Sequence, residues 1–88
     1  MSETAIKLVY FAWVRERIGL SDETVTPPPG TVTIADLVRW LKTRDDGYRA
    51  AFEDEAIVRA AIDHTHVKPH AAIAGAREIA FFPPMTGG

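Results

Sequence analysis

The segment from Phe81 to Gly88 reads FFPPMTGG, and it ends in a carboxylate that could do chemistry. Pro83 and Pro84 cannot donate hydrogen bonds to a neighbouring strand, so they end a strand and stiffen the segment that follows. Glycine has no Cβ atom, and a Gly-Gly end is therefore slim enough to pass through a narrow channel. A free carboxylate is a poor acyl donor, but adenylation by ATP would create a leaving group that a sulfur or amine nucleophile could displace. The Gly88 carboxylate is therefore a candidate reactive group, while the alternative is that the two glycines are simply a disordered end.

The other residue types that could do chemistry are dispersed along the sequence. His64 and His66, two residues apart, could point to one side of a strand, and His70 follows. A zinc site needs three or four ligands, and no fourth ligand is evident, so we expect these histidines to be solvated. The acidic runs at 45–46 and 53–55 are typical of solvated surface charge. We therefore predict no metal site, no bound cofactor and no active site within the chain itself.

The composition indicates one small soluble domain. The sequence has 88 residues, a formal net charge of −2 and no cysteine, which excludes disulfides and thiolate metal sites. Without a basic excess, nucleic acid and anionic membranes are not expected partners. No apolar signal stretch or membrane-spanning run is present, so the expected location is the cytoplasm. We expect a single domain over residues 1–88, with residues 83–88 forming an extended, flexible tail.

The hydrophobic pattern predicts four strands and one main helix. Thr33 is a good helix N-cap, and Asp36 three residues later resembles a capping box. The apolar face of the helix is expected at the i, i+3, i+4, i+7 positions, namely Ile34, Leu37, Val38 and Leu41. The helix is expected to end at 45–47. The other expected elements are strands at 6–13, 23–26, 56–62 and 78–82, short helical segments at 14–18 and 48–52, and loops at 27–30 and 63–75.

The alternation of side chains along the first and last strands of the sequence predicts an exposed aromatic pair. Side chains alternate between the two faces of a sheet, and Lys7 and Glu78 mark the wetter face of the first and last strands. Phe11, together with Trp13, falls on the face of Lys7, and Phe82 falls on the face of Glu78. We therefore expect Phe11 and Phe82 to lie on the side of the sheet that the helix leaves uncovered, where they could contact a partner. The alternative is that a loop covers both rings, or that the alternation slips by one residue.

Two stretches resemble a family of ubiquitin-like proteins, the small, sulfur-carrying subunits of molybdopterin synthase. They are IKLVYFA followed by VRE near the N-terminus, and IAFFPPMTGG at the C-terminus. The resemblance implies an α+β, ubiquitin-like β-grasp fold, with a mixed sheet and one main helix packed across one face. The sequence departs from the family pattern at Gly75-Ala76-Arg77-Glu78, where an acidic turn is common in the family. It also departs at Ile62-Asp63, where the family commonly has a Val-Asn pair.

The same resemblance implies roles for the tail and its partners. An activating enzyme would use ATP to adenylate Gly88, and a sulfur donor system would convert it to a thiocarboxylate. Met85, Thr86 and Gly87 would then enter the large, catalytic subunit in an expected heterotetramer. There the sulfur would pass to a cyclic pyranopterin precursor and build the dithiolene of molybdopterin. The residues expected to contact the partner are Phe11, Phe82, Pro83 and Pro84.

Three classes of function remain open on the sequence alone. The first is the sulfur carrier just described, or a carrier that serves another sulfur pathway such as thiazole or cysteine formation. The second is a ubiquitin-like modifier whose Gly88 is conjugated to a lysine. The third is a plain binding module in which the two glycines are inert. What becomes attached to Gly88, whether sulfur, a lysine or nothing, distinguishes the three.

Overall fold

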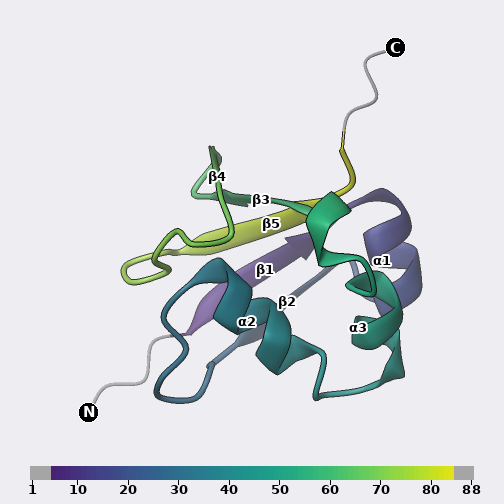
Figure 1. Cartoon of the computed structure of the whole chain (residues 1–88), viewed down its shortest axis with the longest axis horizontal. Helices are drawn as coiled ribbons and strands as arrows, with labels where there is room; N and C mark the ends of the chain where they lie inside the picture. The colour runs from purple at the N-terminus through teal and green to yellow at the C-terminus, as the bar shows by residue number, and fades with distance from the viewer. Residues whose placement is uncertain (1–4, 85–88) are drawn as a thin grey trace.

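The computed structural model describes residues 5–84, which form a five-stranded mixed sheet with helices on one face (Figure 1). The strand order across the sheet is β2-β1-β5-β3-β4. In chain order the elements are β1 (Ile6–Tyr10), α1 (Ala12–Ile18), β2 (Asp22–Val25), α2 (Ile34–Leu41), α3 (Asp46–Ala51), the 3-10 turn η1 (Glu55–Ile57), β3 (Arg59–Ile62), β4 (Thr65–Val67) and β5 (Glu78–Phe82).

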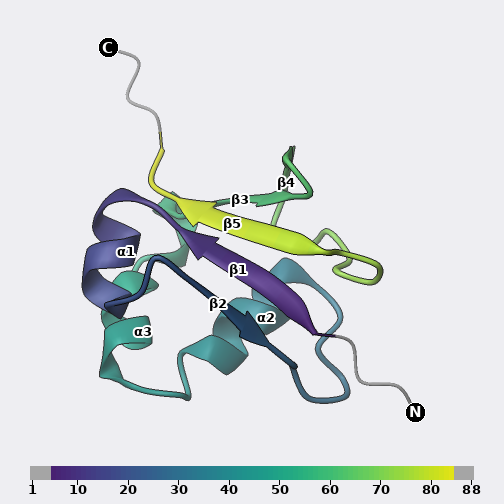
Figure 2. The same ribbon diagram turned by 180° about the vertical axis from the view of Figure 1, so that it is seen from behind.

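The first and last strands lie side by side at the centre of the sheet. β1 and β5 pair in parallel, with Leu8 opposite Ile79 and Tyr10 opposite Phe81. Both strands therefore end at the same edge of the sheet, which Figure 2 shows from the uncovered side. The other pairs, β1–β2, β3–β5 and β3–β4, are antiparallel.

The main helix forms as the sequence predicts. The Thr33 hydroxyl accepts a hydrogen bond from the Asp36 backbone N–H at 3.1 Å, and the Asp36 carboxylate accepts one from the Thr33 N–H at 3.1 Å. The N–H groups of Val32 and Thr33 hold the pKa of Asp36 below its ordinary value. The predicted apolar face of α2 is buried at all four positions: Ile34, Leu37, Val38 and Leu41.

The aromatic centre of the core lies beneath the central strands. The Phe81 ring packs edge-on against the Phe52 ring, with centroids 5.1 Å apart, and stacks with the Tyr10 ring at 6.2 Å. All three side chains are almost completely buried. The alternation predicted for β1 and β5 is therefore confirmed, because Tyr10 and Phe81 point inward.

Hydrogen bonds to the Glu23 carboxylate link α3 to the sheet. The hydroxyls of Tyr10 and Tyr48 both donate to one oxygen of Glu23, at 2.7 and 2.5 Å, and Arg44 reaches its other oxygen at 3.3 Å. Burial, reinforced by the hydrogen bond to Glu23, raises the pKa of Tyr48 to about 12 and raises that of Tyr10 well above its ordinary value. The cluster joins β1, β2 and α3, which are distant in sequence.

Close packing of α1 on α3 explains the glycine at position 47. A Cβ atom there would lie 2.7 Å from the carbonyl oxygen of Arg17, which is too close for any side chain. The Arg17 guanidinium also donates to the Ala50 carbonyl oxygen at 3.2 Å. The contact holds α1 beside the point where the central strands end (Figure 1).

Several predicted boundaries are wrong. The strand expected at 6–13 ends at Tyr10, because the backbone turns at Ala12 (φ 54°) and begins α1, so Trp13 lies in a helix. The main helix ends at Leu41 rather than at 45–47, and Asp45 instead caps α3 by accepting from the Gly47 N–H. The strand expected at 56–62 begins at Arg59, because Asp54 caps the 3-10 turn η1.

Strand β4 was not expected at all, since residues 63–75 read as a loop. Asp63 and His64 both have positive φ, 47° and 73°, and they form the tight turn of a β3–β4 hairpin. Such turns favour glycine or asparagine, so this pair hides the hairpin signal. The Asp63 carboxylate stabilises the turn by accepting from the backbone N–H groups of Arg77 and Glu78, at 3.1 and 2.9 Å.

The position of α2 predicts the effect of a large-to-small substitution in its buried face. Leu41 is completely buried, so Leu41→Ala should lower the free energy of unfolding by about 2–5 kcal/mol. Urea denaturation of the two proteins measures the difference. An unchanged midpoint would contradict the packing of α2 described above.

The tyrosine cluster predicts a loss of stability in alkali. Both phenols have a higher pKa in the folded protein than the value of about 10 in an unfolded chain. The folded state therefore retains protons that the unfolded state loses, and stability falls as pH rises above about 10. Tyr48→Phe should make the fall between about pH 10 and 12 shallower, as measured by urea melts at each pH. Identical slopes for the two proteins would show that the Tyr48 phenol does not titrate as described.

Candidate functional site

The expected reactive segment begins where β5 ends. Pro83 and Pro84 follow Phe82 directly, lie outside any strand and are half-buried. The expected tail residues Met85, Thr86, Gly87 and Gly88 lie outside the described residues, so their roles stay predictions. The described part of the site is therefore the base from which the tail departs.

Phe11 lies at this same edge of the sheet. Its backbone N–H donates to the Phe81 carbonyl oxygen at 3.1 Å, which extends the pairing of β1 with β5 by one residue. Its side chain is 47% exposed, and the residue precedes α1 at the N-cap position. The prediction that Phe11 is exposed is confirmed, although it comes just after the strand rather than within it. Trp13, predicted on the same face, instead packs beneath Arg17, whose guanidinium lies 4.5 Å from the Trp13 ring centre.

Phe82 lies on the uncovered face of β5, as the alternation predicts. Across the sheet its neighbour is Arg59 on β3, while Ala80 lies beside Val9 on β1 and Ala61 on β3. Phe82, Ala80 and Val9 are half-buried, although no helix covers them (Figure 2). We call these four residues, Val9, Ala61, Ala80 and Phe82, the apolar centre of the outer face.

The histidines are not assembled into a metal site. His66 lies on β4, and its ring packs against Phe82 with centroids 5.1 Å apart. His64 forms the hairpin turn, and His70 is exposed in the loop that follows Lys68. Among residues 5–84, no three histidine or acidic side chains are grouped so that they could hold a metal ion.

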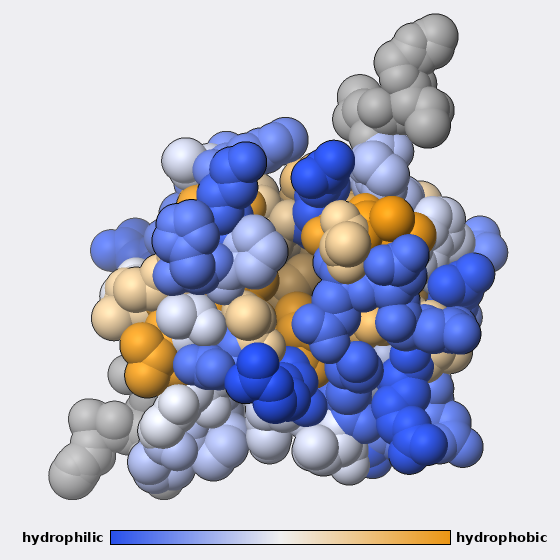
Figure 3. Space-filling model, viewed as in Figure 1, coloured by the Kyte–Doolittle hydropathy of each residue, from blue (hydrophilic) through white to orange (hydrophobic). Residues whose placement is uncertain are grey.

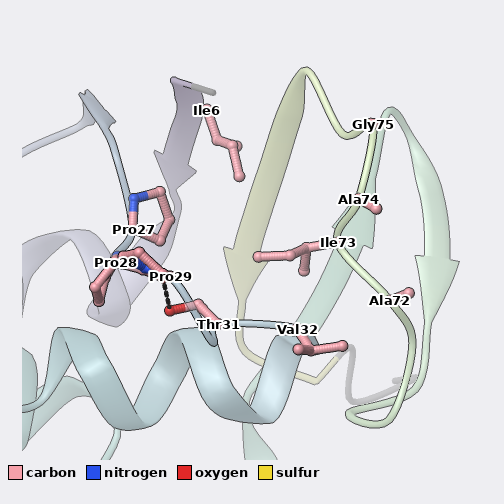
Figure 4. A pocket seen from close by; sticks show the side chains of 10 residues that line it. All are labelled: Ile6, Pro27, Pro28, Pro29, Thr31, Val32, Ala72, Ile73, Ala74 and Gly75. Atoms are coloured by element: carbon pink, nitrogen blue, oxygen red, sulfur yellow. Dashed lines mark hydrogen bonds between the residues drawn. The ribbon is translucent and has the colours of Figure 1, made fainter. Parts of the chain in front are cut away.

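Two mainly apolar hollows in the described part of the chain lie off the outer face of the sheet. One, of about 480 Å³, lies at the start of β1 between the proline loop and residues 72–75, and no titratable side chain lines it (Figure 4). The other, of about 140 Å³, is an apolar recess between α2 and η1 that is visible in the middle of Figure 3. Neither brings together groups that could act as acid, base or nucleophile.

No helix in the described part of the chain is long and apolar enough to cross a membrane. The features that sequence reasoning missed are the Glu23 cluster and the basic residues around the β3–β4 hairpin. Arg59 could have been found from strand alternation, because it shares a face with Ala61 and an arginine marks the wetter face of a strand. Lys68 could not, because the hairpin that positions it was not recognised.

Comparison with known proteins agrees with this arrangement. Residues 8–88 match the ThiS family, which covers all but the start of the chain. This chain belongs to the ThiS family. It is also 35% identical, over 83 residues, to the molybdopterin synthase sulfur carrier subunit of Escherichia coli K12, with 94% of this chain and 99% of that protein covered.

Solved structures confirm the ubiquitin-like β-grasp fold. A Pyrococcus furiosus protein described as molybdopterin converting factor subunit 1 superposes with a TM-score of 0.73 at 23% identity, covering 93% of this chain and 99% of that one. SAMP1 from Haloferax volcanii gives a TM-score of 0.69 at 22% identity, covering 97% and 100%. At these identities the likeness concerns the fold alone.

Proposed function

We propose that this protein is the sulfur carrier subunit of molybdopterin synthase. The observation that carries the proposal is the 35% identity to the Escherichia coli sulfur carrier subunit, which extends over almost the full length of both chains. The ThiS match runs to residue 88 and so includes the Gly-Gly end. The architecture supports the proposal, because the exposed Phe11 and the half-buried Phe82 lie at the edge where the chain leaves β5.

The chemistry resides in the Gly88 carboxylate. One of its oxygens attacks the α-phosphorus of ATP on an activating enzyme, and pyrophosphate leaves. A donor that supplies sulfur at the oxidation level of sulfide then displaces AMP from the acyl adenylate and leaves a thiocarboxylate. The tail carries this sulfur into the large subunit, where the sulfur bonds to the pterin precursor, water hydrolyses the acyl–sulfur bond, and Gly88 returns to a carboxylate.

The folded domain contributes recognition rather than catalysis. The parallel pairing of β1 and β5 brings Phe11 and Phe82 to one edge, so a partner that binds there also receives the tail. Pro83 and Pro84 limit the directions in which the chain can leave β5. Met85, Thr86 and Gly87 then form the narrow part that enters the partner, since glycine adds no side chain near the reacting atom.

A carrier for another sulfur pathway and a protein modifier remain the alternatives. The structural likeness to SAMP1 does not favour the modifier, because a shared fold at 22% identity does not transfer chemistry. A modifier would form an isopeptide bond through Gly88, whereas a carrier returns to its original mass after each transfer. The group attached to Gly88 therefore distinguishes them.

The proposal predicts a defined change of mass at Gly88. Incubation with ATP, the cognate activating enzyme and a sulfur donor should raise the intact mass by the difference between one sulfur and one oxygen atom. Deleting Gly88, or adding one residue after it, should abolish the change, because the carboxylate then sits at the wrong position. Mass spectrometry measures both results, and thermal melts of the variants serve as the folding control.

An intact mass that stays constant with active cognate enzymes would refute the sulfur carrier. A gain equal to a second protein, with the linkage mapped to a lysine, would establish the modifier instead. A thiocarboxylate that forms but supports no molybdopterin with the cognate large subunit would point to another sulfur pathway.

The proposal also predicts that Phe11 contributes to binding of the large subunit. Phe11→Glu should weaken the complex by about tenfold or more, because a buried interface aromatic commonly contributes over about 1 kcal/mol. Val32→Glu is the matched control, since Val32 is 57% exposed near the start of α2, at the other end of the molecule. Titration calorimetry compares the two variants, and equal affinities would exclude Phe11 from the interface.

A further inference from the structure

The uncovered face of the sheet carries a group of basic residues on its β3–β4 side. Arg59 lies on β3, His66 on β4, and Lys68 follows β4 directly. All three are exposed, and together they line a shallow hollow of about 240 Å³ at the β3–β4 edge. We call these three residues the basic rim.

The cations of the basic rim are not neutralised within the described part of the chain. The four ion pairs found in residues 5–84 involve Arg39, Arg44, Arg49 and Lys42, and neither Arg59 nor Lys68 takes part in one. The net charge of the chain is −2, so this local positive charge runs against the overall balance. Two unpaired cations held side by side on a sheet attract an anionic group from a partner.

The basic rim adjoins the apolar centre directly. Arg59 is the cross-strand neighbour of Phe82, and His66 packs against the Phe82 ring at 5.1 Å and lies opposite Ala61. At the other side of the same face, Asp22 lies beside Val9 and is exposed. The face therefore runs from positive at β4, through the apolar centre, to negative at β2, while Lys7 on β1 and Glu78 on β5 lie opposite each other and add one charge of each sign.

An apolar centre with a charged border is the usual anatomy of a protein–protein interface. A nucleic acid fits this face less well, because the acidic Asp22 and Glu78 lie on the same face as its cations and an aromatic and aliphatic surface lies next to them. A protein that covers Phe82 would instead bring its own side chains against Arg59 and Lys68. Carboxylates are the side chains that complement them.

We propose that the basic rim binds carboxylates on the large subunit of molybdopterin synthase and fixes the orientation in which it docks. This inference rests on the proposed function. The basic rim raises the rate of association with the large subunit and aligns that subunit along the face. The channel of the large subunit then meets the segment that follows β5. The apolar centre then supplies most of the lasting contact, because charges at the border of an interface act mainly on association.

The test measures binding of the full chain to the cognate large subunit by stopped-flow fluorescence between about 50 and 500 mM salt. Arg59→Glu should lower the association rate at low salt about tenfold, while the dissociation rate changes much less. Lys68→Glu should act in the same direction, and Arg59→Gln should give an intermediate rate. The association rate of these variants should also depend less on salt than that of the unchanged protein.

Arg49→Glu is the matched control. Arg49 lies on α3, on the helical side, and its side chain is 67% exposed, so this variant has the same change in net charge away from the outer face. The proposal requires that Arg49→Glu changes the association rate less than Arg59→Glu does. Thermal melts establish that each variant is folded.

The outcomes separate this inference from the function on which it rests. If the unchanged protein binds and Arg59→Glu and Arg49→Glu have equal association rates, the proposed role of the basic rim is wrong and the proposed function still stands. If Arg59→Glu changes only the dissociation rate, the proposed role is also wrong, since the basic rim would then act as ordinary contact surface. Failure of the unchanged protein to bind the large subunit would overturn the proposed function itself.

Discussion

The parallel pairing of β1 with β5 is the constraint on which the rest of the structure depends. It joins the two ends of the sequence at the centre of the sheet, with Tyr10 opposite Phe81. Parallel strands cannot be joined by a short hairpin, so the residues between them must form the helices and the outer strands. Because both strands end at one edge, Phe11 and Phe82 lie close to Pro83, where the chain leaves β5. Under the proposed function, backbone pairing rather than an active site places the recognition residues at the base of the reactive segment.

Apolar residues on the two faces of the sheet have different roles. Inward residues of β1 and β5 pack against α2 and Phe52, and they form the centre of the core. Outward residues such as Phe82 and Ala80 contribute little to that core, and no helix covers them (Figure 2). Leaving such residues uncovered carries a risk of unwanted association. The charged residues at either side of the face, Arg59 and Asp22, limit that risk because they disfavour an uncharged partner.

Features determined by local sequence could be predicted, and those determined by distant contacts could not. The Thr33 cap and the apolar spacing of α2 are local, as is the alternation in β5, and all were confirmed. The β3–β4 hairpin was missed because Asp63 and His64 take a left-handed conformation that the Asp63 contacts with Arg77 and Glu78 support. Likewise nothing local shows that Glu23 accepts from two tyrosines distant from it in sequence. The part of the candidate site in residues 5–84 was predicted for its aromatic members, while its basic members depend on the unrecognised hairpin.

The opposite positions of the two ends of β1 have a practical consequence for handling this protein. β1 begins at one end of the molecule, while β1 and β5 both end at the other (Figure 1). A purification tag, fluorophore or surface tether placed ahead of β1 is therefore separated from the edge where β5 ends by the full length of the sheet. Under the proposed function, the molecule can be immobilised or labelled from that end while its partners approach from the other.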